Sequence, residues 1–117
     1  MDPKEIALRA AGVAKSKKAQ KVLVLDIRNI SSFCDYFVIA SGTSLRQVNA
    51  IAFGIEEELG KEGRKPLSKI DSQDESGWVV VDFISVVIHI FHKPVREFYS
   101  LERLWSDAKK VRIPKNA

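Results

Sequence analysis

The chain has 117 residues, 45% of them hydrophobic and 29% charged, and a formal net charge of +4 from 19 basic and 15 acidic residues. This length suits one domain with a buried core, expected over residues 1–117, and no apolar run approaches the roughly 20 residues of a membrane span. The start lacks the apolar core of a signal peptide, and a single cysteine, Cys34, excludes an internal disulfide. We therefore expect a cytoplasmic protein that is not inserted in a membrane.

The first predicted helix begins at Asp2, because an aspartate cap followed by Pro3 and Glu5 is typical of a helix start. Its apolar stripe is narrow and consists of Ile6, Ala10, Val13 and Ala14. Residues 21–27 form a nearly continuous run of apolar, branched side chains, which predicts a strand buried on both faces. After a polar connection, residues 36–40 predict a second strand.

Residues 45–62 predict a central amphipathic helix. Its apolar positions are Val48, Ile51, Ala52, Ile55 and Leu59. Ser44 followed three residues later by Gln47 has the spacing of a capping box, which favours a structural role for the junction from Ser41 to Ser44. The alternative is a nucleotide-binding or nucleotidyltransferase-like enzyme that holds a phosphate at this helix start. The junction lacks the lysine and the spaced glycines of the standard phosphate-binding loops.

A short extended piece is expected at residues 66–70, followed by a polar loop at residues 71–77. Two strands then follow, residues 78–83 and 86–91, close enough in sequence to form an antiparallel hairpin. With a turn through Ile84 and Ser85, Phe83 faces Val86 and Trp78 faces Phe91. Because Ile84 is poorly suited to the positive φ of a two-residue turn, a wider turn that shifts the faces stays open.

This register gives the hairpin two different faces. One face is wholly apolar and predicts the core side: Val79, Val81, Phe83, Val86, Ile88 and Ile90. The other mixes aromatic rings with a carboxylate and an imidazole: Trp78, Val80, Asp82, Val87, His89 and Phe91. Two interpretations stay open for this second face. Either two terminal helical pieces, residues 95–99 and 101–108, fold back and bury it, or it contacts a partner. Ser100 is expected to cap the second piece.

Basic residues gather near both ends of the chain. They are Lys15, Lys17, Lys18 and Lys21, and Lys109, Lys110, Arg112 and Lys115. Solvated ends are one interpretation, and contact with nucleic-acid phosphate is the other. His89, His92 and Cys34 do not form a metal-ligand set, since strand residues at odd spacing point to opposite faces. We expect no catalytic, cofactor or metal site.

Four segments together resemble one known family. They are DYFVIASGTSLRQVNAIA at residues 35–52, GWVVVDF at 77–83, VVIHIF at 86–91 and REFYSLERLWSDA at 96–108. Their order and spacing are similar to those of the ribosomal silencing factor, or Iojap-like, family. The resemblance implies a single α/β domain with a mixed, mostly five-stranded sheet, flanking helices and a topology related to nucleotidyltransferases without their catalytic acids. It also implies that the chain is not an enzyme.

The resemblance further implies binding to the large ribosomal subunit through ribosomal protein L-fourteen. Such binding blocks joining of the small subunit and represses translation when nutrients are scarce. Some members are homodimers, and neither DNA nor membrane is implied as a partner. The partner-facing positions carried over are Trp78, Val79, Val80, Asp82, His89, Tyr99, Leu101, Glu102, Leu104 and Trp105. The chain departs from the family at Ile84-Ser85, where Gly-Asp is usual, and near Ile70-Asp71, where Glu-Gly is usual.

Overall fold

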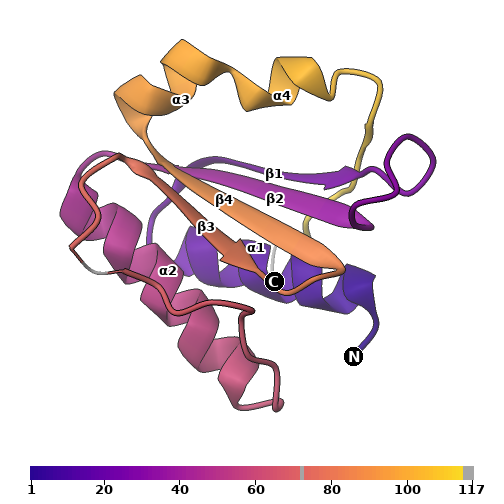
Figure 1. Cartoon of the computed structure of the whole chain (residues 1–117), viewed down its shortest axis with the longest axis horizontal. Helices are drawn as coiled ribbons and strands as arrows, with labels where there is room; N and C mark the ends of the chain where they lie inside the picture. The colour runs from indigo at the N-terminus through magenta and orange to yellow at the C-terminus, as the bar shows by residue number, and fades with distance from the viewer. Residues whose placement is uncertain (72, 115–117) are drawn as a thin grey trace.

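The fold is a five-stranded mixed sheet with helices on both faces, seen in a computed structural model that describes residues 1–71 and 73–114 (Figure 1). The sheet order is β3-β4-β2-β1-β5. The elements are α1 Pro3–Ser16, β1 Gln20–Asp26, β2 Tyr36–Gly42, α2 Leu45–Gly60, β3 Trp78–Asp82, β4 Val86–His92, α3 Lys93–Tyr99, α4 Leu101–Leu104 and β5 Lys109–Lys110. The predicted mixed sheet with flanking helices is confirmed. No helix in the described residues is long and apolar enough to cross a membrane.

The centre of the sheet is the parallel pair of β2 and β4, while the remaining pairs are antiparallel. Every residue of β2 is buried, because strands flank it on both sides and helices cover its faces. The strand β1 meets the expectation of burial on both faces only in its second half, where Val24 and Leu25 are buried on opposite faces. Its first half is interrupted by a bulge between Gln20 and Leu23.

The helices α1 and α2 cover one face of the sheet, and both begin as the sequence predicts. The Asp2 side chain accepts a hydrogen bond from the Glu5 N–H, and the whole predicted stripe of α2 is buried. In α1 the buried face is wider than predicted, since Ala7 and Ala11 are also buried. Alanines there let α1 lie close to the sheet, so this face holds the larger hydrophobic core.

The β3-β4 hairpin has the predicted register, with Trp78 opposite Phe91. Its turn is the tight one, because the Phe83 N–H donates to the Val86 carbonyl at 2.9 Å. Ile84 accordingly takes a φ of +73°, a strained value for a β-branched residue. The Asp82 carboxylate accepts from the Ile84 N–H at 2.7 Å and supports this backbone conformation. The hairpin faces are therefore those predicted.

Three local predictions differ from the structure. Residues 66–70 do not form a strand, and the fifth strand is β5, which pairs with β1. The second terminal helix ends at Leu104 instead of residue 108. Ser100 does not cap that helix by a side-chain bond: its backbone is left-handed, and its hydroxyl donates to the Glu97 carbonyl behind it. Ser72 of the polar loop and Lys115 of the basic tail lie outside the described residues.

Candidate interaction surface

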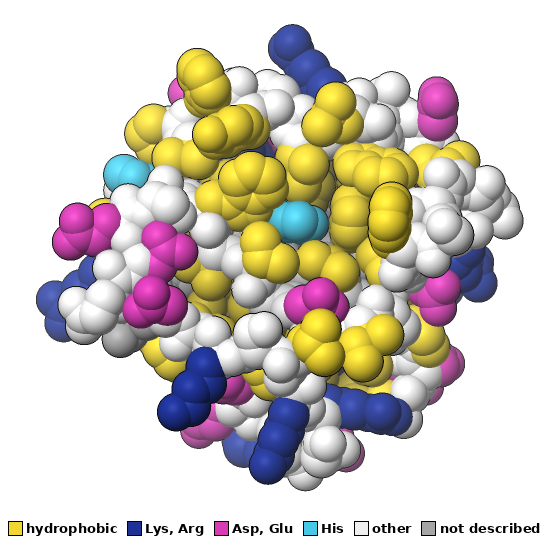
Figure 2. Space-filling model, in the orientation of Figure 1, with side chains coloured by type: hydrophobic (Ala, Val, Ile, Leu, Met, Phe, Trp, Pro, Cys, Tyr) yellow, Lys and Arg dark blue, Asp and Glu magenta, His cyan; other side chains and the backbone are white. Residues whose placement is uncertain are grey.

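All candidate residues except Val79 gather on the sheet face opposite α1 and α2, where α3 and α4 provide only partial cover (Figures 1 and 2). Alternation along β3 and β4 directs one set of side chains to this face. A smaller hydrophobic cluster lies here: Leu25, Ile27, Cys34, Phe37, Ile39, Phe91 and Leu101. In the space-filling view, hydrophobic side chains surround a histidine on this face.

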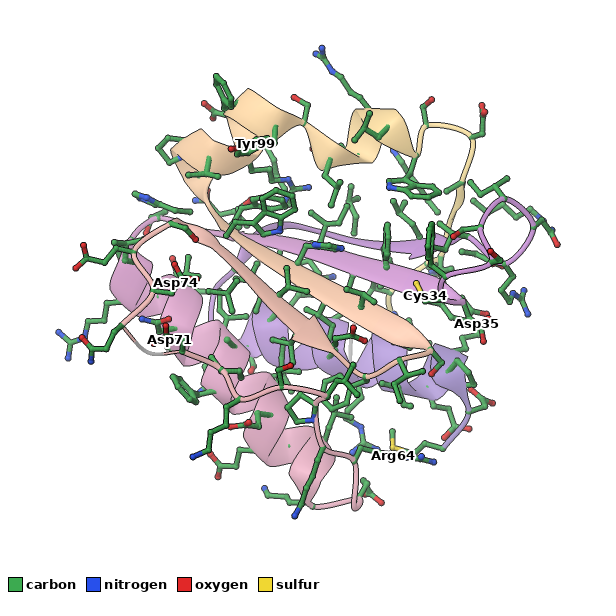
Figure 3. The ribbon with its side chains drawn as sticks, viewed as in Figure 1. Cys34, Asp35, Arg64, Asp71, Asp74 and Tyr99 are labelled. Atoms are coloured by element: carbon green, nitrogen blue, oxygen red, sulfur yellow. The ribbon has the colours of Figure 1, made fainter. Side chains whose placement is uncertain are left out.

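Trp78 is at the centre of a set of aromatic contacts. Its ring lies 4.9 Å from the Phe91 ring and 5.2 Å from the Tyr99 ring, measured between centroids. Tyr99 belongs to α3 and projects above the sheet (Figure 3). The Trp78 indole Nε1–H donates to Nδ1 of His89 at 3.1 Å. These contacts join β3, β4 and α3 into one surface.

His89 is a buried histidine with one unused ring nitrogen. Burial lowers its pKa to about 4, although the nearby Asp82 carboxylate acts in the opposite direction. Since Nδ1 accepts from Trp78, Nε2 carries the proton of the neutral ring. Nε2 has no hydrogen-bond partner in the described part of the chain. The site therefore holds a neutral imidazole with a free N–H donor.

Phe37, which is not among the predicted partner-facing residues, lies beneath these rings. Its ring makes edge contacts with His89, at 4.8 Å between centroids, and with Trp105, at 5.2 Å. It comes from the central strand β2 and is buried. In the sequence, Phe37 stands in an apolar strand. That pattern predicts packing in the core, and it does not indicate that Phe37 lies directly below the aromatic surface residues.

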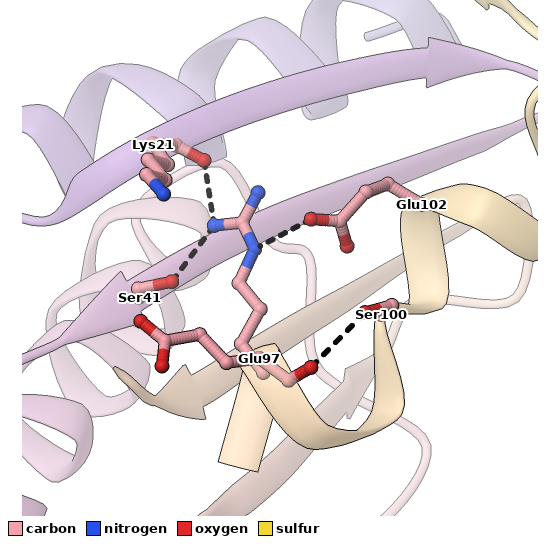
Figure 4. A network of polar contacts seen from close by, with 6 residues as sticks. Lys21, Ser41, Glu97, Ser100 and Glu102 are labelled. Carbon is pink, nitrogen blue, oxygen red and sulfur yellow. Dashed lines mark hydrogen bonds and ion pairs between the residues drawn. The ribbon is translucent and has the colours of Figure 1, made fainter. Parts of the chain in front are cut away.

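A buried arginine fastens α3 and α4 to the sheet. Arg96 is 4% exposed, and its Nη1 donates to the Lys21 carbonyl at 2.7 Å and to Ser41 Oγ at 2.8 Å (Figure 4). Its Nε donates to Glu102 Oε1 at 3.2 Å. These bonds link β1, β2 and α4 to α3. They therefore fix the position of α3, and with it Tyr99, relative to the sheet.

The structure divides the predicted partner-facing residues into three groups. The exposed members are Val80, Tyr99 and Leu104, and the partly buried ones are Trp78, Asp82, Glu102 and Trp105. The buried ones are Val79, His89 and Leu101. Val79 is 7% exposed and lies on the opposite face, in the core beneath α1 and α2. Val79 therefore lies apart from the other partner-facing candidates, whose contact with a partner stays a prediction.

The terminal helices bury this face only in part, and its contact with a partner stays a prediction. Leu101 packs down into the smaller cluster, whereas Leu104 is 76% exposed. Phe98, which the predicted set omits, is 81% exposed and its ring lies 5.1 Å from that of Tyr99. We define the aromatic patch as Trp78, Val80, His89, Phe98, Tyr99, Leu104 and Trp105. The sequence does contain an indication that Phe98 is exposed. Phe98 and Tyr99 are adjacent in a short helix, so both side chains cannot face the sheet.

The junction before α2 is a helix cap. Ser44 Oγ accepts from the Gln47 N–H at 3.1 Å, and Gln47 Oε1 accepts from the Thr43 N–H at 2.6 Å. The return bond of the predicted box thus goes to Thr43 and not to Ser44 itself. Because these amides are bonded within the chain, the junction fits structural capping better than it fits a phosphate site. Ser41 points the other way, to Arg96.

Other reactive groups on this side show no activating geometry. Cys34 is buried just before β2 (Figure 3), and burial raises its pKa to about 11, which keeps the thiol protonated. No cluster of three or more metal-ligating side chains occurs among the described residues.

Comparison with known proteins identifies relatives along the whole chain. The family model described as "Ribosomal silencing factor during starvation" matches residues 1–117. The chain is 43% identical over 108 residues to ribosomal silencing factor RsfS of Bacillus subtilis, covering 92% of this chain and 91% of that protein. It is 35% identical over 94 residues to mouse "mitochondrial assembly of ribosomal large subunit protein 1", covering 79% of this chain but 41% of that protein.

Solved structures have the same fold. A crystal structure of a protein from Chromobacterium violaceum superposes with a TM-score of 0.85 at 28% sequence identity, covering 99% of this chain and 98% of the other. A second, from Bacillus halodurans, gives a TM-score of 0.78 at 33% identity, covering 93% of this chain and 98% of the other.

Proposed function

The chain belongs to the ribosomal silencing factor family, and from this premise we propose that it binds the large ribosomal subunit through ribosomal protein L-fourteen. Its function is ribosome-related and lies in the regulation of translation. The proposed mechanism is steric, since a domain docked on the large subunit occupies space that the small subunit needs. Binding when nutrients are scarce would repress translation in the cytoplasm. The relatives carry the names of regulatory factors, which fits a protein that is not an enzyme.

The observation that carries the proposal is the exposure of the aromatic patch. Phe98 and Leu104 are large apolar side chains that the free chain leaves in water, next to the half-covered rings of Trp78 and Trp105. Exposed apolar patches of this kind mark interaction sites, and tryptophan and tyrosine dominate their binding energy. The buried Phe37 supports the patch from below, which keeps it rigid before binding.

His89 gives the patch a polar requirement. Its Nε2–H lacks an acceptor in the described chain, and a buried donor without a partner is unfavourable by about 1–3 kcal/mol. Nε2 is itself buried, so a partner's carbonyl oxygen could accept from it only if binding moves the side chains that cover it. Asp82, which is partly exposed, adds negative charge beside the apolar centre and would favour a basic partner segment, whereas the charge of Glu102 is paired with Arg96.

The basic ends are proposed to add contact with ribosomal RNA phosphate. The described members are Lys15, Lys17, Lys18, Lys21, Lys109, Lys110 and Arg112. All seven side chains are exposed, so they can move toward a polyanion at little structural cost. Such contacts predict that subunit binding weakens as salt concentration rises.

The exposed patch would also allow two copies to associate, and we propose a homodimer in the absence of the ribosome.

Pelleting with purified large subunits tests the proposal. Leu104→Asp should abolish co-sedimentation and restore reassociation of large with small subunits, because it places a charge in the apolar patch. Phe53→Asp is the matched control, since Phe53 is 38% exposed but lies in α2, which covers the opposite face of the sheet. Equal pelleting of both variants and the unmodified chain would remove the patch from the interface. Absence of any pelleting, together with magnesium-dependent nucleotide binding, would favour the enzyme alternative.

A further inference from the structure

A pocket of about 320 Å³ lies between the beginning of β1, the end of β2 and the α3-α4 segment. We call it the cationic pocket and define it by its lining residues. They are Gln20, Lys21, Ser41, Lys93, Arg96, Glu97, Ser100, Glu102 and Arg103. It lies on the α3 side of the sheet, whereas the capped start of α2 belongs to the helix on the opposite side. Of the junction residues considered above, only Ser41 lines this pocket, and the capping residues Thr43 and Ser44 do not.

Positive charge predominates in this pocket, with four basic residues against two acidic ones. Lys21, Lys93 and Arg103 come from β1, α3 and α4, and their side chains are exposed. A concave site lined by one sign of charge concentrates the opposite ion. The pocket therefore favours an anion.

Arg96 provides a fixed donor in the wall of the pocket. Its Nη1 and Nε are bonded to the chain, and the described residues supply no partner for Nη2. Glu102 offsets part of its charge, but the guanidinium is held in one orientation by bonds to three elements (Figure 4). A charged group that is 4% exposed and held in this way is already ordered for binding.

Backbone strain occurs at the same place. Lys21 has a φ of +49° within the bulge of β1, and its carbonyl is one of the acceptors of Arg96. Bulges and left-handed non-glycine residues recur next to functional sites, where they redirect a side chain. Ser41 lies near the carboxyl end of β2, whose neighbour β4 is parallel to it. In open α/β sheets, ligands bind outside the carboxyl ends of parallel strands.

We propose that the cationic pocket binds the phosphate group of a phosphorylated ligand. A phosphate brings several acceptor oxygens and more than one negative charge, which suits cations that converge from different elements better than a carboxylate does. None of the lining residues is aromatic, so recognition is directed at the phosphate and not at a stacked base. This property goes beyond the proposed ribosomal function and does not depend on it. The phosphate belongs either to a free small molecule or to an RNA backbone.

Titration of the full chain with inorganic pyrophosphate, without magnesium, tests the pocket. The readout is the NMR signal of the Arg96 Nε–H together with the amides of Ser41 and Ser100. We expect saturable shifts at these positions. The variant Lys93→Glu with Arg103→Glu should bind pyrophosphate about tenfold more weakly or worse. The control Lys4→Glu with Lys109→Glu has the same net charge and changes two lysines that do not line the pocket.

The outcomes separate binding from general charge attraction. Shifts confined to the pocket, with affinity lost only in the pocket variant, support the proposal. Equal losses in both variants, or no saturable shift in the unmodified chain, overturn it. A short oligouridine then distinguishes the source of the phosphate. If it displaces pyrophosphate, an RNA backbone occupies the pocket; if it fails while pyrophosphate binds, the ligand is a free phosphorylated molecule.

Discussion

Trp78 donates its indole Nε1–H to Nδ1 of His89, 3.1 Å away on the neighbouring strand. The bond joins an edge strand to the interior of the sheet and fixes the imidazole as its neutral, Nε2-protonated tautomer. A protonated ring would carry a hydrogen on Nδ1, facing the indole N–H. The bond is therefore incompatible with the charged form of His89.

The stability of the fold should fall in mild acid because of His89. Burial lowers the pKa from an ordinary value of 6.5 to about 4 in the folded chain. Between these values the unfolded chain binds a proton at His89 and the folded chain does not, so falling pH favours unfolding. The loss begins below pH 6.5, is complete near pH 4 and amounts to about 3 kcal/mol. Urea unfolding at pH 7 and pH 4.5 measures it.

His89→Phe is the control for that experiment, since it removes the titrating group and keeps an apolar ring. Asp2, Asp26 and Asp74 also have lowered pKa values, through hydrogen bonds to their carboxylates. They are present in both proteins, so the difference between the two pH dependences isolates His89. An identical loss of stability in the variant would show that His89 is not responsible.

Trp78→Phe should destabilise the fold mainly through the lost donor. The smaller ring retains the contact with Phe91, but Nδ1 of the buried His89 loses its partner, which costs about 1–3 kcal/mol. The same change should raise the pKa of His89, because a bond to the neutral form is removed. Combining Trp78→Phe with His89→Phe should cost less than the sum of the single changes. Additive losses would mean that the bond contributes nothing.

Arg96→Lys should be more damaging than a change of one cation for another suggests. Lysine cannot reproduce the two-nitrogen geometry that bonds Lys21, Ser41 and Glu102, and leaves buried acceptors unsatisfied. We expect a loss of about 2–4 kcal/mol in urea unfolding. Arg103→Lys, at an exposed position of α4, is the control and should unfold like the unmodified chain. Equal stability of the two variants would show that the bonds of Arg96 do not hold α3 on the sheet.

The sequence predicts best those features that depend on neighbours along the chain. Asp2 and Ser44 cap their helices through residues only three positions away. Alternation in the hairpin placed Trp78 and His89 on one face because strand geometry requires it. The same reasoning does not identify β5, since Lys109 and Lys110 have no strand pattern and pair with β1 through tertiary contacts alone.

The candidate site was harder to predict because the residues that hold its elements in place are far apart in the sequence. Arg96 bonds residues 75 and 55 positions away, and no local pattern encodes such partners. How far α3 and α4 cover the sheet depends on the left-handed backbone of Ser100, which lies between them. The sequence predicted only a helix cap at Ser100. Partial cover, with Leu101 buried and Leu104 exposed, is a result of that turn.

Ile84→Gly should stabilise the hairpin. Ile84 is exposed and holds a φ of +73°, which the side chain makes unfavourable by roughly 1–2 kcal/mol. Glycine removes this strain but adds freedom to the unfolded chain, so the expected net gain is about 1 kcal/mol. Ile84→Ala is the control, because it retains the Cβ and should give little of that gain. Thermal and urea unfolding compare the variants, and equal stabilisation by alanine would place the benefit in lost surface hydrophobicity instead of relieved strain.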